Sequence, residues 1–153
     1  MIDRKLPALD YQPMDNIIYP RSPREVMSGW VYLPRFIDKI RLHLAGKLHA
    51  DYQENFTKGF DSAWLKAAGV TAEQMIEAVK NSVTDGQVAD WVAKNVKKSD
   101  AEKAAFASFI LNRGTEAGEI AERLEMRKKQ AGLEQRGDIK CFVDFIDADE
   151  KRI

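Results

Sequence analysis

One short pattern recurs along the sequence and constrains the fold more than any other feature. A Ser or Thr is followed three positions later by Glu or Gln at Ser22–Glu25, Thr71–Gln74, Thr84–Gln87 and Ser99–Glu102. In such a capping box the hydroxyl accepts a hydrogen bond from the backbone three residues on, and the longer side chain returns to the first residue. Pro23 suits a first helical position, where its missing N–H would be unpaired anyway. The pattern predicts four helix starts, the first within residues 20–25, PRSPRE.

Helical spacing of apolar residues predicts further helices. A helix over 34–45 begins at Leu33-Pro34 and ends before Gly46, and another runs from Asp61 to Gly69. The next stripes follow the capping boxes, and the chain turns at Gly114 before a helix that ends near Gly132. The residues expected on buried faces include Leu33, Phe36, Ile37, Ile40 and Leu44 in the first of these helices, and Ala101, Ala104, Ala105, Phe109 and Ile110 in a later one.

The C-terminal segment fits two patterns. Ile139, Phe142, Val143 and Ile146 have helical spacing, whereas Cys141, Val143 and Phe145 alternate as in a strand. We favour a helix after Asp138. Because no other stretch indicates paired strands, the predicted fold is all-α: a compact single-domain bundle of six to eight mostly short helices. Residues 21–153 form this domain, and residues 1–20, with three prolines and no apolar period, form an extended N-terminal arm.

Charge and cysteine content exclude several classes of protein. Lys plus Arg and Asp plus Glu both number 24, so no overall positive field attracts nucleic acid or an anionic membrane. The single Cys141 cannot form an internal disulfide, and its apolar surroundings indicate inert packing. No apolar run is long enough to span a bilayer. We therefore expect a cytoplasmic protein that binds neither nucleic acid nor a membrane.

The strongest local positive charge lies between Arg21 and Lys47. This segment contains six basic and two acidic residues, a local charge of +4. Helix N-termini in this segment favour an anion, and arginine forks suit phosphate or carboxylate. The predicted ligand site for a small anion comprises Arg21, Arg24, Trp30, Tyr32, Arg35, Lys39 and Arg41. In the alternative interpretation, Glu25 and Asp38 pair with nearby arginines, the other charges are solvated, and Trp30 packs in the core.

A second charged segment suggests a different function. The tail carries five acidic residues and one lysine between Asp138 and Glu150, a local charge of −4, which we interpret as solvated or as lying against the basic segment of the same chain or of a partner. Leu42 lies on the polar face of the 34–45 helix, with Arg35, Asp38 and Lys39. Together these features favour, as the alternative function, a helical interaction protein that forms a homodimer or binds another protein.

No familiar catalytic or cofactor motif occurs in the chain. His43 and His49 are six residues apart and do not share a helical face, so a zinc site or a general-base pair has little support. The sequence implies no metal and no cofactor, and it leaves open whether the protein is an enzyme.

Several short stretches carry a family resemblance. They are Pro20–Arg24, Gly29-Trp30-Val31, Leu33-Pro34-Arg35, Asp38-Lys39, Arg41 and Leu44–Lys47, followed by Tyr52, Phe60-Asp61, Leu65, Gly69, Asp85-Gly86 and Trp91. The pattern resembles the bacterial DUF5069 family, a domain of unknown function, over about residues 20–92. Members often have two glycines and a Tyr where this chain has Ser28, Gly29 and Trp30. The resemblance implies a bacterial origin and a stand-alone domain, but no activity.

Overall fold

Three of the four predicted capping boxes stand at helix starts in the structure, a computed structural model that describes residues 17–153. They begin α4 (Ala72–Lys80), α5 (Asp85–Asn95) and α6 (Asp100–Asn112). The hydroxyls of Thr71, Thr84 and Ser99 each accept from the backbone three residues on, and the Gln or Glu side chain reaches back. Most of the predicted N-terminal arm, residues 1–16, lies outside the described residues.

The fourth box does not start a helix, so the prediction at Ser22 is wrong. Residues 22–25 form a turn closed by a hydrogen bond from Glu25 N to Ser22 O, at 3.1 Å. The Ser22 hydroxyl accepts from Arg24 N and donates to Asp147. A capping box starts a helix only where residues with an apolar helical period follow it. Too few residues lie between the Ser22 box and the helix start at Leu33-Pro34 to form such a helix.

Those intervening residues form a small hairpin that the sequence analysis missed. Strand β2 (Val26–Met27) pairs antiparallel with β3 (Trp30–Val31). Ser28 and Gly29 join them with φ angles of 55° and 80°, as a two-residue hairpin turn of this hand requires. A Ser-Gly pair between two apolar pairs is a weaker signal than Asn-Gly, which is why the hairpin was hard to predict.

The remaining elements confirm a mostly helical fold, with eight helices in residues 17–153. They are α1 (Leu33–Leu44), α2 (Ala50–Gln53), α3 (Gly59–Ala68), α7 (Glu119–Gln130) and α8 (Phe142–Asp149), besides α4 to α6. The C-terminal segment is thus a helix, as favoured. None of the helices described here has the length and apolar character needed to cross a membrane.

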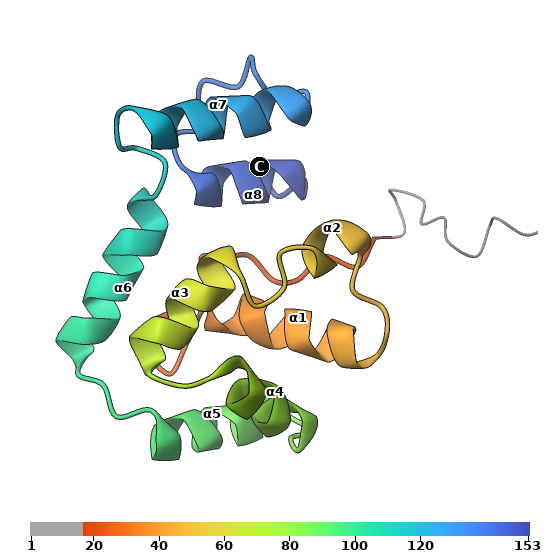
Figure 1. The fold of residues 1–153 in the computed structure, drawn as a ribbon, viewed down its shortest axis with the longest axis vertical. Coiled ribbons are helices and arrows are strands. Elements are labelled where there is room, and N and C mark those ends of the chain that lie inside the picture. The colour runs from red at the N-terminus through yellow and green to blue at the C-terminus, as the bar shows by residue number, and fades with distance from the viewer. Residues whose placement is uncertain (1–16) are drawn as a thin grey trace, which may run out of the picture.

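The helices fall into two parts, which we call the body (residues 17–112) and the cap (residues 115–153). In Figure 1, α1 to α5 lie together in the body, α6 runs along one side of them, and α7 and α8 lie together beyond α1 to α3. The body encloses an aromatic core around Trp30, Phe36 and Trp64, to which α8 adds Val143. The cap has a small cluster of its own, consisting of Leu124, Ile139, Phe145 and Ala148.

Gly114 joins the two parts in a conformation that few other residues adopt. Its φ is 110°, and a Cβ there would lie 3.1 Å from both Cys141 Cα and Phe142 N. Phe142 N donates to Arg113 O at 2.8 Å, so the start of α8 is held against the end of α6. The predicted turn at Gly114 therefore brings α8 back onto the body.

Two predicted apolar stripes differ from the buried faces. In α1, Leu33, Phe36, Ile37 and Ile40 are fully buried, but Leu44, the last residue of the helix, is exposed. In α6 the buried residues are Phe106 and Ile110, whereas Phe109 and the predicted alanines are exposed. The prediction is therefore correct for Ile110 and wrong for Phe109 and the alanines, whose weak apolar signal did not define the buried face.

Candidate functional site

Two of the predicted anion-binding arginines share one carboxylate at the start of α5. Arg21 donates from Nε and Nη2 to Asp38, both at 3.0 Å, and from Nη1 to Asp85 at 2.9 Å. Arg41 donates to the other oxygen of Asp85 at 2.6 Å. Burial alone would raise the pKa of Asp85, but the bonds from Arg41 and Arg21 outweigh it and lower that pKa. These ion pairs link α1 and the segment before it to α5.

Arg24 contacts the acidic tail. Its guanidinium donates to Asp147 at 2.7 Å and to Asp144 at 2.5 Å, both on α8. The acidic tail was expected to lie against the basic segment of the same chain or of a partner, and the structure brings the two together within the chain. The interpretation of the tail as solvated is wrong for Asp147 and Glu150, each 4% exposed.

Arg35 forms a buried fork with Glu150 at the C-terminal end of α8. Nη1 and Nη2 donate to the two carboxylate oxygens at 2.9 and 2.7 Å. Tyr52 OH donates to the same carboxylate at 2.6 Å. This bidentate geometry is the strongest form of an arginine–carboxylate pair. It links the body to the cap.

Lys39 pairs with Asp61, which is fully buried at the start of α3. The distance from Nζ to Oδ2 is 2.8 Å, and Tyr32 OH donates to Oδ1 at 2.5 Å. Thr57 N donates to Oδ2 at 2.9 Å. Tyr32 and Thr57 have φ angles of 78° and 63°, so two residues in the left-handed region bond to one carboxylate. Such strain persists only where the surroundings enforce it, and it clusters at functional sites.

The structure therefore does not bring the seven predicted site residues together. Trp30 lies in the core with edge-to-face contacts to Trp64 and Phe106. Each of the five predicted cations already has a carboxylate partner, and most partners are distant in sequence. An anion at any of them would have to compete with that carboxylate. The alternative interpretation was correct in placing Trp30 in the core, but Arg35 and Lys39 are buried in ion pairs rather than solvated.

Three of the seven residues, Tyr32, Arg35 and Lys39, do line a cavity of about 790 Å³ between the body and the cap. We call it the interhelix pocket. Residues of α1 to α3 and Phe109 of α6 line it from the body, and residues of α7 and α8 line it from the cap. Its other cations and its aromatic side chains were not predicted from the sequence: Lys58, Arg113, Arg123 and Arg127, with Tyr52, Phe60, Phe109, Phe142 and Phe145.

The cations on the pocket wall differ in their pairing. Arg113 pairs with Glu116 and lies over the Phe109 ring. Within residues 17–153, no carboxylate lies at ion-pair distance from Lys58, Arg123 or Arg127. Arg127 lies 5.6 Å from the centre of the Phe145 ring, a cation–π distance. These three exposed cations are the positive groups of the pocket that remain open to a ligand.

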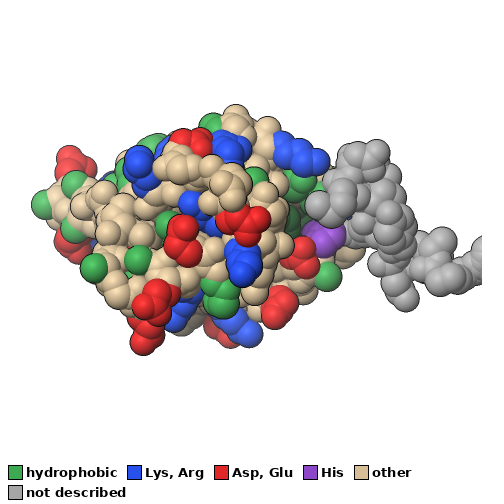
Figure 2. All heavy atoms as spheres, turned by 90° about the horizontal axis from the view of Figure 1, so that it is seen from above, with side chains coloured by type: hydrophobic (Ala, Val, Ile, Leu, Met, Phe, Trp, Pro, Cys, Tyr) green, Lys and Arg blue, Asp and Glu red, His purple; other side chains and the backbone are tan. Residues whose placement is uncertain are grey.

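Acidic groups also reach this wall, so its charge is mixed. Asp51, Glu54 and Asp149 line the pocket together with Glu150, which is already bound to Arg35. Burial, and then the neighbouring Glu150, raise the pKa of Asp149. Figure 2 shows acidic and basic side chains interspersed over the face of the molecule seen from above Figure 1, rather than gathered in a patch of one sign.

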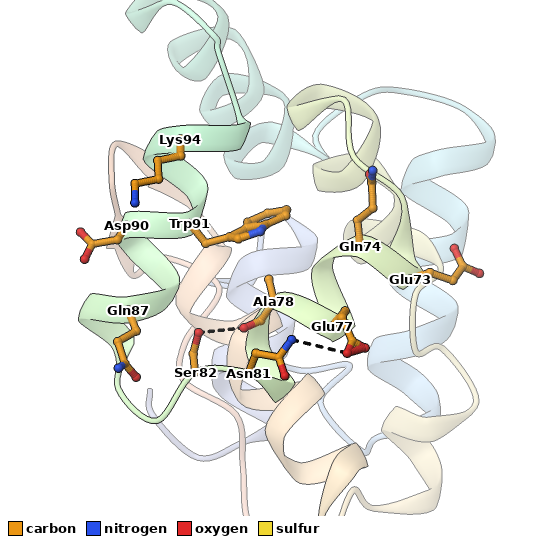
Figure 3. A pocket seen from close by; sticks show the side chains of 10 residues that line it. All are labelled: Glu73, Gln74, Glu77, Ala78, Asn81, Ser82, Gln87, Asp90, Trp91 and Lys94. Carbon is orange, nitrogen blue, oxygen red and sulfur yellow. Dashed lines mark hydrogen bonds between the residues drawn. The ribbon is translucent and has the colours of Figure 1, made fainter.

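A second hollow, of about 730 Å³, lies between α4 and α5 and is drawn in Figure 3. Trp91 lies over this hollow. Most of the polar groups in its wall form hydrogen bonds within α4 and α5 or at their ends. Ser82 donates to Ala78 O, Asn81 donates to Glu77, and Gln74 and Gln87 belong to the capping boxes. This hollow presents fewer uncommitted polar groups than the interhelix pocket.

The two histidines and the cysteine have local contacts. The His43 ring stacks on the Phe56 ring, with 4.4 Å between the ring centres, and its Nδ1 contacts Gln53 Oε1. His49 caps α2 by accepting a hydrogen bond from Asp51 N. Cys141 is buried, and burial raises the pKa of its thiol, which makes the reactive thiolate rarer. In the described part of the chain, no three His, Cys, Asp or Glu residues are grouped to hold a metal ion.

Arg123, Arg127 and Gln130 line the pocket from one face of α7, at spacings of four and three residues. That spacing was visible in the sequence and could have marked a basic face. It was not distinctive, because α7 also carries Glu119, Glu122 and Glu125.

Fold and site together define a small, mostly helical domain whose central helix is held by buried ion pairs and whose cap closes a pocket of mixed charge. The chain belongs to the DUF5069 family, described as a domain of unknown function, whose family model matches residues 17–152. The resemblance predicted from residues 20–92 is thus confirmed and extends through the cap. Comparison with curated proteins finds no match.

Proposed function

We propose that the interhelix pocket binds a small organic anion, a carboxylate or phosphate that carries an apolar or aromatic part. The observation that carries the proposal is the exposure of Lys58, Arg123 and Arg127 on an aromatic wall without a carboxylate at ion-pair distance in residues 17–153. The anionic ligand was expected from the sequence, but its charge partners here are different residues.

Size and lining support this function. Small-molecule sites typically enclose 300–1,000 Å³ and combine apolar walls with a few polar groups that orient the ligand. Phe109, Phe142 and Phe145 supply the apolar wall here. Arginine adds a planar fork that matches carboxylate or phosphate oxygens. The Arg35–Glu150 and Lys39–Asp61 pairs are buried in the opposite wall, so these two cations do not have to bind the anion themselves.

Thermal unfolding with a panel of aromatic carboxylates and phosphate esters tests the proposal. A ligand at 100 times its dissociation constant stabilises the folded protein by about 2.7 kcal/mol. Arg127→Gln should weaken binding about tenfold or more, because a hydrogen bond to a charged group contributes about 1.5–3 kcal/mol. Arg136→Gln is the matched control, since Arg136 pairs with Asp138 and does not line the pocket. Equal losses in both variants, or no stabilisation by any compound, would contradict the proposal.

The homodimer remains a prediction, and the two features that suggested it have explanations within one chain. Leu42 is half-buried and packs against the body core. The acidic tail meets Arg24 and Arg35 of the same chain. Light scattering at low and high salt tests the prediction directly.

A further inference from the structure

Lys39 places a primary amine in the wall of the interhelix pocket, in surroundings that differ from those of an ordinary surface lysine. The residue lies in the middle of α1, is 5% exposed and lines the pocket. Its side chain is therefore held by the fold and by Asp61, and the residue forms part of the pocket wall. Buried lysines are uncommon, and those that line cavities supply the amine for Schiff-base chemistry in many enzymes.

Groups that can move protons surround this amine. Asp61 lies 2.8 Å from Nζ, and the Tyr32 hydroxyl bonds to the other oxygen of the same carboxylate. Tyr32 and Thr57, which both hold Asp61, have strained left-handed backbones. Strain of this kind costs about 1–3 kcal/mol for each residue and clusters at functional sites.

We propose that Lys39 is a covalent carbonyl-binding site, which condenses with an aldehyde or ketone group of a ligand in the interhelix pocket to form an imine. The proposal deepens the anion-binding function and depends on it only for the preference for an anionic carbonyl compound. Tyr32 and Asp61 act on the proton transfers.

The step balances without any further reagent. The Lys39 ammonium gives a proton to Asp61, and the free amine attacks the carbonyl carbon to form a C–N bond. The carbonyl oxygen then takes up two protons, one from the attacking nitrogen and one returned by Asp61, and leaves as water when the C–O bond breaks. Ammonium plus carbonyl becomes protonated imine plus water, so the net charge does not change. Asp61 faces a cation before and after the reaction.

The charges around the amine favour this chemistry. Burial lowers the pKa of Lys39, Asp61 opposes that effect, and Arg35 one turn earlier lowers the pKa further. Glu150, the partner of Arg35, acts weakly in the opposite direction. A desolvated lysine beside another cation has more neutral amine at neutral pH and is a better nucleophile.

Reductive trapping tests the proposal on the wild-type chain. The protein is incubated near neutral pH with benzaldehyde or with 4-carboxybenzaldehyde, reduced with cyanoborohydride, digested and mapped by mass spectrometry. We expect Lys39 to be labelled at least about tenfold more than the exposed Lys66 and Lys80. The excess should shrink as the pH rises toward 10 and the exposed amines lose their protons. Labelling spread evenly over the lysines, or absent from Lys39, overturns the proposal.

The two probes separate this inference from the proposed function. If Lys39 prefers the carboxylated aldehyde and Arg127→Gln abolishes the preference, both stand. If Lys39 reacts equally with both aldehydes, the carbonyl site stands and the anion site fails. Lys39→Arg keeps a cation beside Asp61 but cannot form the imine, so it should remove the dominant adduct while the exposed lysines still react. Tyr32→Phe, checked for folding by circular dichroism, should slow the trapping at Lys39 alone.

Discussion

The body and the cap are stabilised in different ways. The body core is apolar and rich in aromatic rings, with Trp64 in edge-to-face contact with Trp30 and Phe36 at 5.8 and 5.9 Å. The cap has a small apolar cluster and meets the body through α8, which contributes Val143 to the body core and carboxylates to Arg24 and Arg35. Apolar burial therefore dominates the body, and ion pairs contribute much of the junction.

This difference determines how each part responds to change. Apolar burial depends little on pH and is strengthened rather than screened by many salts. A buried ion pair contributes only while both partners are present, and losing one leaves an uncompensated charge. The interhelix pocket has one wall from each part, so any loosening of the cap also opens the proposed ligand site.

The largest effect is expected in the body, from Trp64→Ala. The side chain is fully buried, and truncation leaves a large cavity, so we expect the free energy of unfolding to fall by about 3–5 kcal/mol. Urea unfolding followed by circular dichroism measures this loss. Val83→Ala is the control, because Val83 is 86% exposed and should change stability by less than about 0.5 kcal/mol. A small effect of Trp64→Ala would mean that the body core is not the main source of stability.

A somewhat smaller effect is expected at the junction, from Glu150→Gln. This change keeps the shape of the side chain but leaves Arg35 buried without its counter-charge, which we expect to cost about 3 kcal/mol. Hydrogen exchange should show faster opening of α8 and α7 than of α4. The double variant Arg35→Met, Glu150→Leu removes both charges and should recover most of the loss. Equal acceleration throughout the chain would show that body and cap unfold as one unit.

The features that the sequence could predict are those that depend on local contacts. Capping boxes and helical stripes depend on neighbours within a few residues, so α4, α5 and α6 were predicted at their starts, and α1 and α8 from their periods. The Ser22 box failed because a hairpin rather than a helix follows it, and its hydroxyl donates to Asp147, 125 residues away. No local pattern contains such a partner.

The candidate site was less predictable for the same reason. The basic segment was identified correctly as unusual, but its charges serve to hold α1 between α5 and α8. Arg35 and Lys39 lie on the polar face of α1, and only the fold shows that Glu150 and Asp61 cover that face. The exposed cations of the pocket come mainly from α7, which in sequence resembles an ordinary solvated helix.

The smallest expected effect concerns Arg24 and Asp144, the more exposed ion pair of the junction. Burial alone would raise the pKa of Asp144, but the hydrogen bonds from Lys140 N and Arg24 outweigh it, so the pKa lies below its ordinary value. A carboxylate with a lowered pKa stabilises the folded state above its unfolded pKa, and this contribution is lost as the pH falls through its folded pKa. Asp144→Asn should therefore cost less than about 1 kcal/mol at pH 7, since Arg24 is 43% exposed and solvent screens the pair.

That cost should vanish in acid, where the wild-type carboxyl is itself protonated. Hydrogen exchange of α8 as a function of pH measures it: the two proteins should differ near pH 7 and converge once the pH falls below the lowered pKa of Asp144. Asp138→Asn is the informative control, because pairing with Arg136 lowers the pKa of Asp138 to about 2, yet the pair lies wholly within the cap. If Asp138→Asn loosens α8 from the body as much as Asp144→Asn does, the acid response arises from the cap's own stability. If only Asp144→Asn does so, the ion pairs of the junction set the pH at which the pocket opens.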